Sequence, residues 1–97
     1  MLQGKIMDYT QKYKEVLLGN PSLIMGKKGV NEGLLHHISE LLKQQKIVKI
    51  KMLKTALHGQ KKEKIAQTVA EKTNSHMLDL RGRTFILSKI PLDVHNL

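Results

Sequence analysis

Apolar residues recur at helical spacing in three segments of the chain. The clearest begins after Asn31, a residue type that favours helix N-caps, and runs to about Gln45. A first helix is predicted to begin after an N-cap at Asp8 and to end at Gly19, and a third helix to cover residues 61–73. The apolar stripe of the middle helix consists of Leu34, Leu35, Ile38, Leu41 and Leu42. The narrower stripe of the third helix consists of Ile65, Ala66, Val69 and Ala70.

Strand patterns fill the segments between these helices. Residues 47–53 alternate, with apolar Val48, Ile50 and Met52 on one face and lysines on the other. This alternation predicts a half-buried strand whose second face is polar. Residues 22–25, "SLIM", form a short apolar run that is typical of a buried strand.

The end of the chain reads as a hairpin. Residues 76–80 and 84–89 are apolar-rich segments joined through "RGR", where Gly82 can supply the turn. Pro91 is expected to end the last strand, because proline cannot donate a ladder hydrogen bond. Residues 92–97 are predicted to form a loosely held tail.

The order of these elements, α-β-α-β-α-β-β, predicts the fold class: α/β, as a single domain over residues 1–97. Strand–helix–strand repeats are typical of a small mixed sheet, here of four strands, packed with helices and joined by right-handed crossovers. Three aromatic residues lie on apolar stripes or strands and are predicted to belong to the core: Tyr9, Tyr13 and Phe85.

Charge narrows the choice of partners. Seventeen Lys and Arg against eight Asp and Glu give a net charge of +9. Residues 21–54 hold seven lysines against two glutamates, so the excess is concentrated there. Such a balance suits a polyanionic partner, with a solvated lysine-rich surface as the alternative.

Several classes of protein are excluded or disfavoured by composition. The chain has no cysteine, which excludes thiolate metal sites and cysteine nucleophiles. No segment approaches the roughly 18 consecutive apolar residues of a membrane span. The segment "MLQGKIMDYTQKYK" lacks the apolar stretch of a secretory signal, so we expect a cytoplasmic protein.

The segment "GKKG", residues 26–29, lies between a predicted strand and the helix that follows it. Unpaired backbone N–H groups and the helix dipole make such a place suitable for an anion, and two lysines add positive charge. A basic turn that merely faces water is the alternative. The Walker spacing GxxxxGK and the dinucleotide fingerprint GxGxxG are both absent, so the loop suits a nucleic-acid backbone better than a nucleoside triphosphate.

Three segments, in this order, resemble the CRM domain (chloroplast RNA splicing and ribosome maturation), whose stand-alone bacterial form is called YhbY. They are "PSLIMGKKGVNEGLLHHISELLKQQKIVKIKM", "IAQTVAEKTN" and "LRGRTFILSK", and the similarity covers about residues 21–91. The resemblance implies an RNA-binding module shaped like the C-terminal domain of a bacterial translation initiation factor. Stand-alone members associate with precursors of the large ribosomal subunit, so ribosomal RNA or pre-ribosomal particles are the expected partners. No cofactor is expected.

The resemblance also implies which residues contact RNA. The GxxG loop, expected to act as in KH domains, corresponds to Gly26, Lys27, Lys28 and Gly29, and the basic position of the hairpin to Arg83. Because the aromatic residues are predicted to be buried, we expect binding led by shape and charge with modest sequence preference. Further basic candidates are Lys49, Lys51, Lys54, Lys61, Lys62 and Arg81.

An enzyme is not expected. The glutamates lie among lysines on helix surfaces, where they are typical of ordinary side-chain pairing. His36 and His37 are adjacent on a predicted helix and therefore diverge by about 100°. They cannot easily share a metal, and the HExxH spacing is missing.

Other binding functions stay open. A DNA-binding chromatin protein of the archaeal Alba type also carries a basic loop before a helix and is the main alternative. A protein-only assembly factor is a third possibility. A membrane-surface helix over residues 61–72 is disfavoured, because its apolar face offers no Trp, Phe or Leu anchor.

Overall fold

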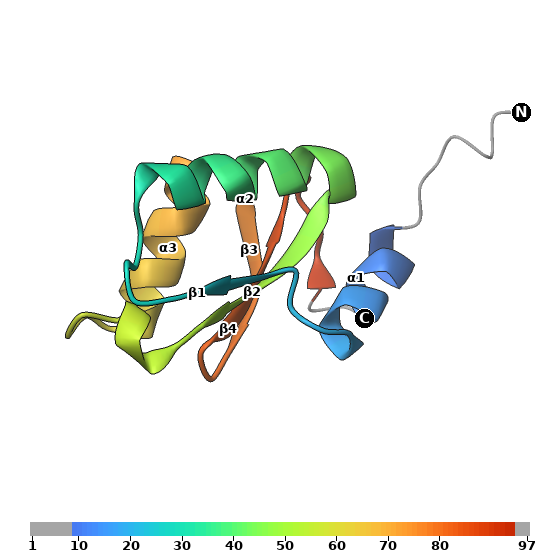
Figure 1. Ribbon diagram of the computed structural model, residues 1–97. Coiled ribbons are helices and arrows are strands. Elements are labelled where there is room, and N and C mark those ends of the chain that lie inside the picture. The colour runs from blue at the N-terminus through green and yellow to red at the C-terminus, as the bar shows by residue number, and fades with distance from the viewer. Residues whose placement is uncertain (1–8, 95–97) are drawn as a thin grey trace, which may run out of the picture.

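The elements follow the order that the sequence predicts (Figure 1). The computed structural model describes residues 9–94, so the predicted N-cap at Asp8 lies outside the described residues. A short 3-10 turn, η2 (Lys54–Ala56), lies within the segment between the second strand and the third helix. The other elements are α1 (Tyr9–Leu18), β1 (Leu23–Met25), α2 (Glu32–Gln45), β2 (Ile47–Met52), α3 (Lys62–Lys72), β3 (His76–Arg81) and β4 (Thr84–Ser88).

The four strands form one mixed sheet in the order β1-β2-β4-β3. β1 is parallel to β2, whereas β4 is antiparallel to both of its neighbours. The predicted fold class is therefore confirmed. The prediction that residues 22–25 form a buried strand is wrong in one respect: β1 is an edge strand, and although Met25 is fully buried, Ile24 is 56% exposed.

Helices α2 and α3 pack on one face of the sheet. Ile38 and Leu42 of α2 are fully buried, and the whole predicted stripe of α3 is buried. They meet Phe85, which is buried on β4 as predicted. Each fully buried side chain of this size contributes about 1.5–3 kcal/mol, so this core anchors both helices firmly on the sheet. It thereby fixes where α2 and α3 begin.

Helix α1 packs on the opposite face, near the beginning of β2. Tyr13 is buried there against Ile47 and Ile86, and these three residues form what we call the α1 cluster. Tyr9 packs partly buried beside them, so the predicted core position of both tyrosines is confirmed. The predicted polar second face of residues 47–53 is wrong at its beginning, because Ile47 faces α1 rather than water.

A bulge in β3 changes which residues face α1. The strand register passes from Met77 to Asp79, which leaves Leu78 without a partner on β4. Leu78 packs against the α1 cluster, and Asp79 lies on the same face opposite Ile86. The bulge therefore brings an apolar side chain and a carboxylate together under one helix.

The segment after the last strand is more ordered than the sequence implied. Leu92 and Val94 pack partly buried against the α1 cluster. The prediction of a loosely held tail is therefore wrong for residues 92–94, because their apolar side chains complete the cover of this cluster. Residues 95–97 lie outside the described part of the chain.

Candidate nucleic-acid interface

Residues 26–29 form a tight turn between β1 and α2. The N–H of Gly29 donates to the carbonyl oxygen of Gly26 at 2.9 Å, which closes the turn. Lys27 and Lys28 occupy its two central positions, and both are exposed. The turn therefore presents two ammonium groups to solvent at the end of the edge strand.

The two glycines of the turn have different roles. Gly29 is buried with a φ of +65°, and a Cβ there would lie 3.0 Å from Cδ2 of His58 and 3.2 Å from the carbonyl oxygen of Ala56. A side chain at this position would be both strained and crowded. A Cβ on Gly26 would meet nothing within 4 Å. Gly29 is thus a structural requirement, whereas Gly26 leaves open space beside the lysines.

A histidine holds the turn from behind. Nε2 of His58 lies 2.6 Å from the carbonyl oxygen of Lys27, and since a carbonyl only accepts, the ring must donate. His58 and Gly59 have positive φ values of 48° and 79°, which reverse the chain so that the ring reaches the turn. The sequence does not predict this role of His58. The two partners are 31 positions apart, and no local pattern joins them.

The helix behind the turn is less suited to an anion than the sequence implied. Asn31 caps α2 as predicted, because its Oδ1 accepts from the N–H of Leu34 at 2.9 Å. One of the amides available at the helix start is therefore already satisfied. Glu32 adds a carboxylate in the first turn, where it opposes an incoming phosphate. The two lysines are therefore a stronger source of positive charge at this place than the helix dipole.

The hairpin and the end of β2 lie next to the turn. The N–H of Leu53 donates to the carbonyl oxygen of Met25 at 2.9 Å, directly before the turn begins. The N–H of Met52 donates to the carbonyl oxygen of Arg83 at 2.7 Å. In return, Nε of Arg83 donates to the carbonyl oxygen of Met52 at 3.3 Å. Arg83 therefore lies at the same end of the sheet as Lys27 and Lys28.

Three further lysines lie at this end of the molecule. Lys54 is exposed and begins η2, which borders Gly29 through the carbonyl oxygen of Ala56. Lys61 and Lys62 stand at the start of α3, which has no side-chain cap. Cations near the positive end of a helix dipole are unfavourable by about 0.3–1 kcal/mol each, and Glu63 in the same turn offsets part of this cost. Figure 1 shows the turn, η2 and the start of α3 on the side away from α1.

Lys49 lies apart from these residues and has a structural role. Its Nζ donates to the carbonyl oxygens of Leu17 and Gly19, at 2.9 Å each. These carbonyls stand at the C-terminal end of α1, where a cation is favourable. The side chain of Lys49 therefore fastens α1 to the sheet.

Lys51 and Arg81 also lie on the face of the sheet that α1 partly covers. They belong to one row across the four strands, with Ile24 and Thr84 as the other members. Both are exposed, and Nε of Arg81 lies 2.9 Å from a carboxylate oxygen of Asp79. They form a second basic patch on a different face from the turn.

The ion pair of that patch also acts on α1. Burial, followed by the negative charge of Asp79, raises the pKa of the Tyr13 phenol above its ordinary value of 10.0, and Arg81 lowers it in part. The charges of Asp79 and Arg81 thus act on the buried phenol by which α1 packs on the sheet.

Metal sites and membrane spans are both missing from residues 9–94. No three or more acidic or histidine side chains of the described residues gather in a way that could hold a metal ion. Within the same residues, no helix combines the length and the apolar character needed to cross a bilayer.

The fold is shared with a protein of known structure. The chain has the fold of SAV1595, a hypothetical protein of Staphylococcus aureus whose solution structure is known, with a TM-score of 0.65 and 22% sequence identity. The likeness covers 96% of this chain and 93% of that one. No curated protein matches the chain. The family model of the CRS1/YhbY (CRM) domain matches residues 2–89, and the chain therefore belongs to this family.

Proposed function

We propose that the protein binds RNA by its sugar–phosphate backbone, through the turn at residues 26–29 and the cations around it. The observation that carries this proposal is the presentation of Lys27 and Lys28. Both are exposed on a turn that is closed by its own hydrogen bond and held from behind by His58. Because the backbone of the turn is already held, only the two lysine side chains need to be ordered when a phosphate arrives.

The family and the structural neighbour support RNA as the partner. The chain belongs to the CRS1/YhbY (CRM) domain family. SAV1595 is itself described as a candidate RNA-binding protein. Both agree with the net charge of +9 and with the gathering of Lys54, Lys61, Lys62 and Arg83 around the turn.

Backbone recognition fits the aromatic residues better than base stacking does. Tyr13 is buried in the α1 cluster, with Tyr9 packed beside it, and Phe85 is buried in the core under α2 and α3. The described residues therefore offer no exposed platform of aromatic rings on which bases could stack. Binding led by charge and shape, with modest sequence preference, follows from this arrangement.

The biological setting of the proposal comes from the family resemblance. We propose that the whole chain acts as one RNA-binding domain in the cytoplasm and takes part in assembly of the large ribosomal subunit. Precursor ribosomal RNA is the proposed target. Crosslinking in cell extract, followed by sequencing of the bound RNA, tests this part of the proposal.

The direct test is a fluorescence-anisotropy titration with a structured RNA at several salt concentrations. The double variant Lys27→Ala/Lys28→Ala should bind more weakly, and its log–log salt slope should fall by about 0.7–0.9 for each phosphate that the variant no longer neutralises. Lys14→Ala/Lys89→Ala is the matched control. It removes the same charge from two exposed positions, one on α1 and one beyond the end of β4.

The outcomes separate the alternatives. Equal weakening in the turn variant and the control would show that net charge matters and the turn does not. Tighter binding of duplex DNA than of RNA in parallel titrations would favour the Alba-type alternative. A wild-type protein without any salt-dependent affinity for nucleic acid would favour a protein-only assembly factor.

A further inference from the structure

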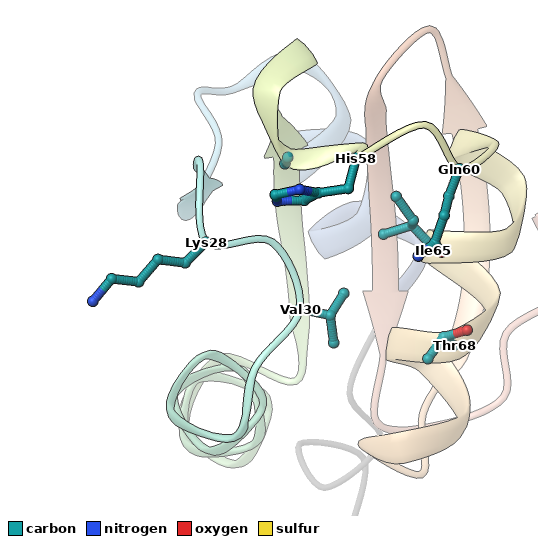
Figure 2. A pocket seen from close by; sticks show the side chains of 7 residues that line it. Lys28, Val30, His58, Gln60, Ile65 and Thr68 are labelled. Carbon is teal, nitrogen blue, oxygen red and sulfur yellow. The ribbon is translucent and has the colours of Figure 1, made fainter.

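A pocket of about 220 Å³ lies between the basic turn and α3 (Figure 2). Its walls come from the segment after the turn, from the connection between β2 and α3, and from α3 itself. Lys28 belongs to the wall nearest the turn, but its side chain points away from the pocket. The ammonium group is thus available outside while the pocket opens beside it.

The floor and the rim of the pocket differ in chemistry. Val30, Ala56 and Ile65 are apolar, and the last two are 2% and 3% exposed. The polar residues are His58, Gln60 and Thr68. A flat ring with polar edges would satisfy both, because its face can lie on the apolar surface while its edge meets the rim.

Part of the pocket lining is held in place before any ligand arrives. The ring of His58 is held by its bond to the carbonyl oxygen of Lys27, and Ile65 belongs to the main core. The N–H of Gln60 donates to the carbonyl oxygen of Leu57 at 2.8 Å, which holds the backbone of the rim. A preformed pocket loses little entropy on binding.

We propose that this pocket receives one unpaired base of the RNA strand whose backbone passes the basic turn. The proposal rests on the proposed function and adds a base-binding subsite to it. The carboxamide of Gln60 offers a donor and an acceptor to the edge of the base, and the hydroxyl of Thr68 offers a further partner. The pocket is small for a drug-sized ligand but suits a single ring system. A strand held in this way must be single-stranded at that nucleotide.

The first test uses the wild-type protein and two short single-stranded RNAs of equal length and charge. One carries all its bases, and the other carries abasic nucleotides at its centre. Because only the intact strand can place a base in the pocket, it should bind about fivefold more tightly or better, with the same salt slope. Equal affinity for the two strands would overturn the base pocket and leave backbone binding intact.

The second test fills the pocket. Thr68→Leu places a larger side chain on the pocket face of α3, whereas Gln67→Leu adds the same side chain at its exposed neighbour. Thr68→Leu should abolish the preference for the intact strand and keep the salt slope, and Gln67→Leu should change neither. If both variants keep the preference, the base lies elsewhere and the proposal fails.

The carboxamide of Gln60 and the position of the bound base can be tested separately. Gln60→Ala keeps the backbone bond of the rim and removes the carboxamide, so differences in affinity among A, C, G and U at the central position should shrink. Amide chemical shifts of Ala56, Ile65 and Thr68 should move with the intact strand and stay in place with the abasic one. Absence of all RNA binding would instead remove the proposed function, and the pocket proposal with it.

Discussion

The imidazole of His58 donates a 2.6 Å hydrogen bond to the carbonyl oxygen of Lys27, the first of the two central residues of the basic turn. The same ring lies against Gly29, where its Cδ2 would be 3.0 Å from a Cβ. One side chain thus holds the turn at its centre and leaves no room for a side chain at its end. The conformation that presents the lysines depends on a residue from another part of the chain.

Removal of this hydrogen bond should loosen the turn without unfolding the protein. His58→Asn suits the φ of +48°, because asparagine tolerates left-handed backbone, but its shorter carboxamide cannot reach Lys27. A hydrogen bond is worth about 1 kcal/mol, so hydrogen exchange at the amide of Gly29 should quicken about fivefold. RNA affinity should fall with it. The longer side chain of His58→Gln can reach Lys27 again and should recover much of the slow exchange and of the RNA affinity. If hydrogen exchange at Gly29 is unchanged in His58→Asn, the ring does not hold the turn.

The two glycines of the turn should respond differently to the same substitution. Gly29→Ala should lower the free energy of unfolding by about 1–3 kcal/mol, because it combines a φ of +65° with close approach to His58 and Ala56. Gly26→Ala should leave stability within about 0.5 kcal/mol, since its methyl group meets open space.

Urea denaturation of both variants measures the difference in the free energy of unfolding. RNA titration measures any difference in affinity. If the RNA backbone passes close to Gly26, the methyl group of Gly26→Ala should weaken binding at unchanged stability. A stable Gly29→Ala protein would contradict the assigned geometry of the turn.

Local patterns in the sequence predict the elements, because each depends on neighbours along the chain. The stripe of α3 and the cap at Asn31 are examples, since spacing and side-chain chemistry alone define them. The contact between His58 and Lys27 is of another kind. It joins two loops only after the sheet and α3 have packed, so no short window of sequence contains it.

The same limit explains the different positions of the lysines on β2. The alternation predicts that Lys49 and Lys51 lie on the same polar face, and it predicts no difference in their surroundings. Packing of α1 over the beginning of the strand then separates them, because it brings the carbonyl oxygens of Leu17 and Gly19 to Lys49 and leaves Lys51 exposed. Where a helix will dock on a sheet is a tertiary property, and the alternation does not encode it.

Substitution of these two lysines should therefore affect stability differently. Lys49→Met removes two hydrogen bonds from a charged donor and should lower the free energy of unfolding by about 1–2 kcal/mol, with little change in the salt slope of RNA binding. Lys51→Met should leave stability unchanged, and a smaller salt slope would place the second basic patch in contact with RNA. Denaturation and anisotropy titrations of the pair decide this. Equal stability of the two variants would show that the hydrogen bonds of Lys49 to α1 contribute nothing.

The packing of α1 should also depend on pH in the alkaline range. The pKa of Tyr13 is raised above 10.0 by burial and by the charge of Asp79. Below that pH both folded and unfolded chains keep the phenol protonated, and stability does not depend on this group. Above it the unfolded chain ionises first and binds fewer protons, so the free energy of unfolding should fall until the pH reaches the folded-state pKa. Tyr13→Phe removes this group while the lysines still titrate in both proteins. The variant should therefore lose less stability than the wild type between about pH 9 and about pH 11. A parallel decrease in the two proteins over this range would show that the Tyr13 phenol ionises as easily under α1 as in the unfolded chain.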